Sequence, residues 1–227
     1  SIKSIMEHKV ERARREGKVV PQWADEKEFL ADPRANPVIA WPMHLFDCSP
    51  ISDGAGCVLL VGAELARDFT DAPLYVAGLG QASGRSLHAA EALTYFEATR
   101  HAAAEAYAMA GLGPEDIQVA EVHDCFSIAE ILHVEDLGFC KAGEGYKAVE
   151  EGITRLDGPK PINTSGGLKC KGHPVGATGV AQLVELWEQL RHQAGPRQVP
   201  NPNLRLGAAH NLGGTGGTCT VTLLERR

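Results

Sequence analysis

Three short polar clusters in this sequence combine residue types that move protons. Each cluster holds a histidine, and the first also holds a thiol two residues after its histidine. Imidazole and thiol groups serve as general acids and bases, so side chains of this kind indicate chemistry at a carbon or carbonyl centre. The three clusters are His123-Asp124-Cys125, Gly172-His173-Pro174 and His210-Asn211.

The cluster around His173 has the most specific surroundings. The segment 165–179, SGGLKCKGHPVGATG, contains five glycines and a His-Pro pair within fifteen residues. Glycines at this density let the backbone approach a ligand closely, and the following Pro174 restricts the backbone of His173. A lone loop histidine is more often structural than functional, but the glycine frame favours a functional role for this one.

The other two clusters each allow two interpretations. Cys125 stands where a predicted strand gives way to a predicted helix, and a helix N-terminus favours a thiolate that acts as a base or nucleophile. A small buried cysteine, with Asp124 capping the next helix, explains the same residues equally well. The glycines after Asn211 either direct backbone N–H groups at a developing oxyanion or form a tight β-turn without a ligand.

The sequence pattern predicts an α/β fold in which these clusters lie at the ends of strands. Residues 1–16 predict a charged helix, and 17–45 look irregular. From residue 73 the order is β-α-β-α followed by β-α-β-β, which favours a mostly parallel sheet with helices on both faces. Predicted strands are 56–62, 73–79, 117–123, a strand end at 161–163, 204–211 and 218–225, and predicted helices are 92–111, 126–138 and 177–195.

Composition excludes several classes of protein. Net charge is −7 over 227 residues and no basic stripe is present, so we expect no nucleic-acid binding. No apolar run reaches the roughly 18 residues of a membrane helix, and the charged start is unlike a signal peptide. The six cysteines form no CxxC pair. We therefore expect mostly buried, reduced thiols, no metal site, no membrane association and a cytoplasmic location.

Taken together, the motifs resemble the thiolase superfamily. HDCFS (123–127), SGGLKCKGHPVGATG (165–179) and HNLGGTGG (210–217) occur in the family's order, and CSPISDGAGCVLLV (48–61) resembles the strand that closes a thiolase N-terminal domain. The variant is similar to sterol-carrier-protein-type thiolases and to acetyl-CoA acetyltransferases of that branch. The resemblance implies a thiolase-like fold in its C-terminal βαβαβαββ half (73–227), preceded by a remnant of the N-terminal or loop domain (1–72).

The resemblance also implies a reaction and a role for each residue. The reaction would be Claisen condensation or thiolytic cleavage of a 3-oxoacyl-CoA, with coenzyme A as substrate and no further cofactor. His173 would activate the nucleophilic thiol, Cys125 would exchange the α-proton, and His123 and Gly213 would serve the two oxyanion holes. Asn211 replaces a second cysteine found in many thiolases. The nucleophile itself would come from a missing N-terminal thiolase half, because none of the six cysteines has that context.

Other readings and partners follow from the same residues. GLGQASG (78–84) is one residue too long for a dinucleotide fingerprint, which argues against a Rossmann dehydrogenase. A thiolase-like aldolase acting on a steroid or aromatic acyl-CoA, or a non-catalytic thiolase-fold subunit, remains an alternative. The resemblance implies a homodimer or tetramer of the complete unit and, in some members, a small OB-fold, zinc-ribbon acyl-CoA-binding protein as partner.

Overall fold

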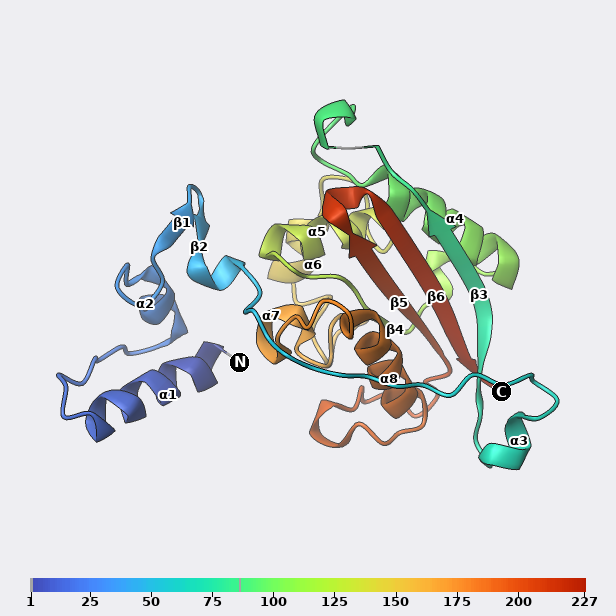
Figure 1. Ribbon diagram of the computed structural model, residues 1–227, viewed down its shortest axis with the longest axis horizontal. Helices are drawn as coiled ribbons and strands as arrows, with labels where there is room; N and C mark the ends of the chain where they lie inside the picture. Colours follow the sequence, from blue (N-terminus) through green and yellow to red (C-terminus); the bar gives the residue numbers. More distant parts are fainter. Residues whose placement is uncertain (1, 86) are drawn as a thin grey trace.

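A four-stranded mixed sheet forms the centre of the protein (Figure 1). The computed structural model describes residues 2–85 and 87–227. The strand order is β3-β6-β5-β4. β6 pairs antiparallel with both β3 and β5, and β4 pairs parallel with β5. The strands are β3 (Leu74–Ala82), β4 (Val119–Glu121), β5 (Leu206–Gly213) and β6 (Thr218–Arg226).

The expected α/β class is confirmed, but the expectation of a mostly parallel sheet is wrong. β5 and β6 are joined by the short turn 214–217, so they must run antiparallel as a hairpin. β6 then lies between β5 and β3, which adds a second antiparallel pair. The strand end expected at 161–163 is a single bridge between Ile162 and Ala120.

Helices cover both faces of the sheet, as expected. Alternate residues of β5 face opposite sides, so that Ala208 packs in the core with α4 and α5, whereas Ala209 packs in a second core with α8. Figure 1 shows α8 on one side of the sheet and α4 on the other. The helices are α4 (Glu97–Ala110), α5 (Ser127–Asp136), α6 (Gly145–Glu150), α7 (Gly167–Lys171) and α8 (Thr178–Leu190).

Close contact between α4 and β3 depends on two glycines. A Cβ atom at Gly78 would collide with the carbonyl oxygen of Ala106, and one at Gly80 would collide with that of Ala102. Both positions therefore let the helix backbone lie directly on the strand. Gly111 ends α4 in the left-handed conformation (φ 66°), as its position in the sequence predicts.

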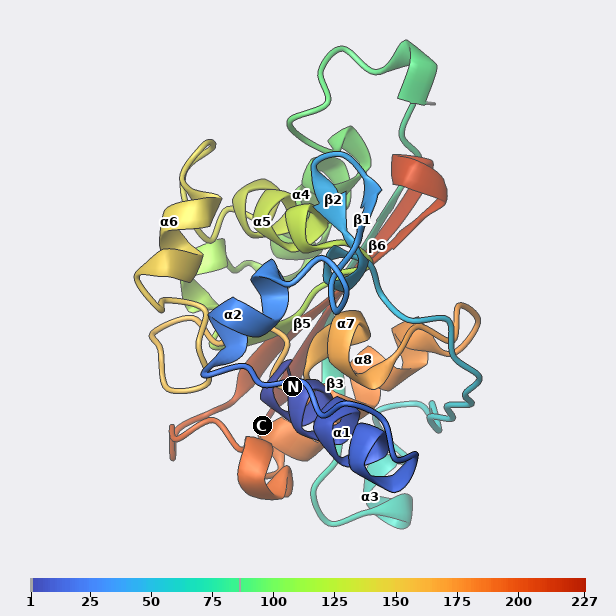
Figure 2. The same cartoon turned by 90° about the vertical axis from the view of Figure 1, so that its left-hand side faces the viewer.

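The N-terminal residues form a small separate layer, which lies beside the main body in Figure 1 and in front of it in Figure 2. The predicted first helix is present as α1 (Ile2–Arg15). The expectation that 17–45 is irregular is wrong in part, because this stretch contains α2 (Glu26–Ala31), β1 (Val38–Ala40) and β2 (Met43–His44). Asp25 begins α2 by accepting hydrogen bonds from Lys27 N and Glu28 N.

An extended segment connects this layer to β3 by way of the short helix α3 (Ala66–Phe69). The strand expected at 56–62 is extended chain that pairs with no other strand among the described residues. Its apolar side chains face solvent, and Leu59 and Leu60 are 69 % and 77 % exposed. None of the helices in 2–85 and 87–227 is long and apolar enough to cross a bilayer.

Candidate active site

His123 and His173, which are fifty residues apart in the sequence, lie against each other in the structure. Their ring centroids are 5.0 Å apart and the rings are nearly perpendicular, at 85°. His123 follows β4, and His173 lies in the connection between α7 and α8. His123 is buried and His173 is partly exposed. The structure therefore joins the first two sequence clusters into one site.

A neighbouring threonine determines which nitrogen of His173 carries its proton. The hydroxyl of Thr178 donates to Pro174 O at 3.1 Å, and the same oxygen lies 2.7 Å from His173 Nδ1. Because a hydroxyl has one proton to donate, Thr178 must accept from Nδ1–H. Burial lowers the pKa of His173, which favours the neutral ring. The lone pair of neutral His173 is then on Nε2 and is available to accept a proton.

His123 is a neutral group at pH 7. Burial, with a smaller contribution from His173, lowers its pKa to about 4. Its backbone N–H points at His210 Nδ1 at 3.4 Å, and its own Nδ1 is buried without a hydrogen-bond partner among the described residues. A neutral imidazole still has one ring N–H group. His123 can therefore stabilise an oxyanion by donating a hydrogen bond, without contributing a positive charge.

Cys125 is a partly buried thiol and not the thiolate that its position before a helix suggests. Burial raises its pKa and the negative charge of Asp124 raises it further, which outweighs the backbone N–H of Phe126. Asp124 does not cap the following helix α5. It accepts from Leu168 N at 2.7 Å and Lys169 N at 3.4 Å, and so ties the first cluster to the glycine-rich segment.

A short stretch of the N-terminal part runs between the two clusters. Ser49 N donates to Cys125 O at 2.9 Å, and His173 N donates to Pro50 O at 3.3 Å. Isolated β-bridges also join Cys48 to Phe126 and Ile51 to His173. The backbones of both candidate acid–base residues are thus held by one extended strand of four residues.

The third cluster lies at the same end of the sheet. β4 ends at Glu121, opposite Ala209 in the parallel β4–β5 ladder, so the chain leaves β4 toward His123 beside His210, whereas β5 continues to Gly213. Gly213 ends β5 with extended backbone (φ −121°). The side chain of Asn211 donates to Gln182 Oε1 at 3.0 Å, so its amide is engaged in structure.

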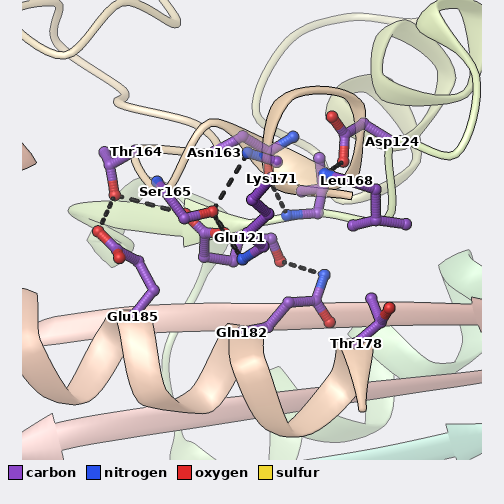
Figure 3. A network of polar contacts seen from close by, with 12 residues as sticks. Glu121, Asp124, Asn163, Thr164, Ser165, Leu168, Lys171, Thr178, Gln182 and Glu185 are labelled. Atoms are coloured by element: carbon purple, nitrogen blue, oxygen red, sulfur yellow. Dashed lines mark hydrogen bonds and ion pairs between the residues drawn. The ribbon is translucent and has the colours of Figure 1, made fainter. Parts of the chain in front are cut away.

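A polar network that was not predicted from the sequence lies beneath the site (Figure 3). Buried Glu121, at the end of β4, contacts the segment 164–171, and Gln182 of α8 donates to His210 O at 2.9 Å. A charged residue inside an otherwise apolar strand was the available signal for Glu121. Nothing local in the sequence predicts its partners.

Two buried histidines pack together behind the site: His210, from the third sequence cluster, and His133, which was not predicted. The His133 ring packs against His210 and Phe96, with centroids 4.2 and 4.9 Å away. Burial lowers the pKa of His210 to about 3 and that of His133 well below its ordinary value. Thr99 Oγ1 lies 3.0 Å from His210 Nε2, whereas neither ring nitrogen of His133 has a partner among the described residues.

The six cysteines form no disulfide in the structure. All six cysteines are free, but only Cys219 is buried, and Cys57 and Cys170 are exposed. The expectation that most are buried is therefore wrong. Within residues 2–85 and 87–227, no group of three or more His, Cys, Asp or Glu side chains is arranged to hold a metal ion.

Comparison with known proteins places these residues in a family. The thiolase C-terminal domain-like family matches residues 80–226. Acetyl-CoA acetyltransferase of Methanothermobacter thermautotrophicus is 54 % identical over 190 residues, which cover 83 % of this chain and 49 % of that protein. Sterol carrier protein 2 of Bos taurus is 41 % identical over 192 residues, covering 81 % of this chain and 34 % of its own length.

The fold has a similar solved structure. A chain of the structure described as Ltp2-ChsH2(DUF35) aldolase superimposes with a TM-score of 0.75 at 26 % identity, covering 87 % of this chain and 51 % of that chain. This chain spans about half the length of the acetyltransferase it matches, and about a third of the sterol carrier protein. The family match covers more than half of the sequence and includes all three clusters. The chain belongs to the thiolase family, and residues 80–226 are its thiolase C-terminal domain.

Proposed function

We propose that this chain carries the acid–base part of a thiolase that makes or cleaves 3-oxoacyl-CoA. The observation that carries the proposal is the meeting of His123 and His173, whose ring centroids are 5.0 Å apart, with Cys125 two residues after His123 in the chain. The 54 % identity to an acetyl-CoA acetyltransferase supports the same reaction class. The roles of the individual residues are those that the thiolase resemblance implies, and the protonation states of His123, Cys125 and His173 support them.

His173 is suited to act as the base that activates a nucleophilic thiol. Its Nε2 lone pair accepts the thiol proton, and Thr178 holds the ring through Nδ1. The resulting thiolate attacks the carbonyl carbon of an acyl-CoA, and coenzyme A leaves as its thiol after taking up a proton. The product is an acyl group bound to the enzyme as a thioester.

Cys125 then exchanges a proton with the second substrate. In condensation it removes the α-proton of an acyl-CoA, and the carbanion attacks the enzyme-bound thioester. In cleavage the order reverses, and the Cys125 thiol protonates the departing carbanion. His123 and Gly213 would donate hydrogen bonds to the thioester oxygens as negative charge develops on them, and each such donor contributes about 3–4 kcal/mol in comparable enzymes.

The nucleophilic cysteine would come from an N-terminal thiolase half. The chain spans about half of the acetyltransferase, and its extended segment 56–62 presents apolar side chains to solvent, as a strand does when it lacks its sheet. We further propose that the complete unit is a homodimer or tetramer in the cytoplasm. A small OB-fold, zinc-ribbon acyl-CoA-binding protein is proposed as an additional partner, since the similar aldolase structure is described with a DUF35 component.

Substitution of Cys125 tests the proposed reaction. The assay uses the chain together with a polypeptide that supplies the N-terminal half, and measures both thiolysis and condensation of acetoacetyl-CoA. Cys125→Ala should reduce both rates by about 10²–10⁴-fold, the usual contribution of a positioned acid or base. Cys140→Ala, which also removes a partly buried thiol, is the matched control and should retain activity. Unchanged rates in Cys125→Ala would favour a non-catalytic subunit.

An aldolase is the second candidate, favoured by the 26 % identical structural neighbour. Retro-aldol cleavage of a 3-hydroxyacyl-CoA with a steroid or aromatic acyl group needs no free coenzyme A, because no enzyme thioester has to be released. Thiolysis consumes one coenzyme A per turnover. Measuring product formation with and without added coenzyme A therefore separates the two activities.

A further inference from the structure

Glu121 is a carboxylate in a position where a charge is costly. It ends the short buried strand β4, and its side chain is 1 % exposed. The preceding strand residues Val119 and Ala120 belong to the two apolar cores. A buried carboxylate in such a place needs several hydrogen bonds or an ion pair to offset the loss of hydration. The partners of Glu121 therefore indicate what it does.

The first group of partners comes from the start of the glycine-rich segment. Ser165 N donates to Glu121 Oε1 at 3.1 Å. Thr164 Oγ1 lies 3.4 Å from the same oxygen, but its single proton goes to Glu185 Oε1 at 3.0 Å. The Ser165 hydroxyl donates to the other oxygen, Oε2. Backbone and side chain of Ser165 are thus both held by one carboxylate, as Figure 3 shows.

The second partner comes from the end of the same segment. Lys171 Nζ lies 3.6 Å from Glu121 Oε2 and donates to Ser165 Oγ at 2.8 Å. Ser165 Oγ also accepts from Gly167 N at 3.2 Å. Glu121, Ser165 and Lys171 form a closed set of contacts that brings the two ends of 165–171 together. His173 follows Lys171 by two residues.

Neighbouring polar residues hold other parts of this region. Asp124 binds Leu168 N and Lys169 N in the middle of the segment, and Asn163 joins Val122 N to Glu130 before the segment begins. Glu185 of α8 accepts from Thr164 and pairs with Arg197. Among the carboxylates of this network, Glu121 is the one whose contacts reach both Ser165 and Lys171.

We infer that Glu121 is a positioning residue, whose carboxylate closes the segment 165–171 and thereby fixes the His173 ring against His123. Its consequence for catalysis rests on the thiolase function proposed above, whereas its effect on His173 does not. Only Gly172 separates Lys171 from His173, so the contacts of Glu121 end within two residues of the imidazole. Displacement of a reacting group by about 1 Å costs on the order of 10²-fold in rate.

The substitution Glu121→Gln keeps the shape of the side chain and removes its ability to accept from both sides. Its amide NH2 replaces one carboxylate oxygen. In place of Oε1 it would face Ser165 N–H, and in place of Oε2 it would face the Lys171 ammonium, so a contact at one end of the segment is lost in either orientation. Lys171→Met removes the ammonium group that contacts Glu121 and Ser165. Because the Lys171 side chain is partly exposed, this change puts the fold at less risk. Glu185→Gln is the matched control, because Glu185 is also buried and also binds Thr164 but does not contact Lys171.

Two readouts are measured on the folded chain with its complementary half. The first is the ¹⁵N NMR spectrum of the His173 imidazole, which reports whether Nδ1 alone carries the proton. The second is kcat and KM for acetoacetyl-CoA thiolysis. For Glu121→Gln and Lys171→Met we expect a mixture of His173 tautomers and a fall in kcat of roughly 10²-fold with KM nearly unchanged. Glu185→Gln should match the wild type in both.

An unchanged His173 spectrum in folded Glu121→Gln or Lys171→Met would overturn the inference, as would an equal change in Glu185→Gln. If Glu121→Gln does not fold, Lys171→Met decides. If the wild-type assembly lacks thiolase activity, the proposed function fails on that result, and the NMR comparison still tests the positioning role separately.

Discussion

His123, His173 and Cys125 are all uncharged at neutral pH, although the position of Cys125 before a helix favours a thiolate in the sequence. Burial reinforces the uncharged form in each case, because it lowers the pKa of the imidazoles and raises that of the thiol. Neutral resting groups mean that a proton has to move at each step. The pH dependence of the reaction should therefore depend on its direction.

The raised pKa of Cys125 predicts opposite pH profiles for synthesis and cleavage. Condensation requires the Cys125 thiolate, so its kcat should rise with pH to beyond the ordinary thiol pKa of about 8.5. Cleavage uses the proton of the thiol, so its kcat should fall over the same range. Stopped assays in both directions between pH 6 and 10 would check this, and a condensation rate that is flat above pH 7 would contradict it.

Buried His133 should make the free energy of unfolding depend on pH. Folded His133 stays neutral because its pKa is well below 6.5, whereas the unfolded imidazole takes up a proton as pH falls below about 6.5. The wild type therefore loses stability from this residue on acidification. Relative to wild type, His133→Phe should gain about 1.4 kcal/mol of unfolding free energy per pH unit well below 6.5.

Urea unfolding of both proteins at pH 7.5, 5.5 and 4.5 measures this difference. The exposed His101→Phe variant on α4 reports how much of the change follows from losing any imidazole. A difference between His133→Phe and wild type that does not vary with pH would show that folded His133 takes up the proton.

At the scale of elements, the packing of α4 on β3 depends on the absence of side chains at Gly78 and Gly80. Gly80→Ala would place a methyl group against the carbonyl of Ala102 and force the helix away from the strand. We expect the free energy of unfolding to fall by about 1–3 kcal/mol. Chemical denaturation measures it, with Gly176→Ala as control, since no atom lies within 4 Å of a Cβ there.

The elements that sequence reasoning located correctly are those with a strong local pattern. The long alanine-rich and amphipathic stretches are α4 and α8, and the last two predicted strands are β5 and β6. The predicted start of α4 at residue 92 is too early, since the helix begins at Glu97 after Phe96. The sheet order was not predictable, because the position of β6 between β3 and β5 depends on contacts between residues far apart in sequence.

In the candidate site, too, features with a local sequence pattern were predicted and long-range contacts were not. His123, Cys125 and His173 were found from residue type and glycine content, and the structure brings the two histidines together. The capping of α2 by Asp25 was readable locally and was overlooked. The polar contacts of Glu121, and the packing of His133 on His210, are long-range and have no local signature.

At the scale of the whole molecule, the exposed apolar segment 56–62 predicts assembly. Burying Leu59 and Leu60 against an N-terminal half would contribute about 1.5–3 kcal/mol for each side chain. The double variant Leu59→Asp, Leu60→Asp should no longer co-elute with that half in size-exclusion chromatography. Thermal unfolding of the variant chain alone should match the wild type, because both side chains already face solvent.

Val19→Asp is the control for this experiment, since Val19 is 93 % exposed and lies outside the segment. Its elution with the N-terminal half should be unchanged. Continued co-elution of the double variant would assign the interface to another surface.

The extended stretch 48–51 limits how far the chain can be shortened from its N-terminal side. A fragment that starts at residue 73, just before β3, would lack Ser49 and Pro50, the backbone partners of Cys125 and His173. A boundary before Cys48 would keep them. In a series of chains shortened one residue at a time from the N-terminal side, those that start at or before residue 48 should fold. The yield of folded protein should fall sharply once the deletion extends past Ile51.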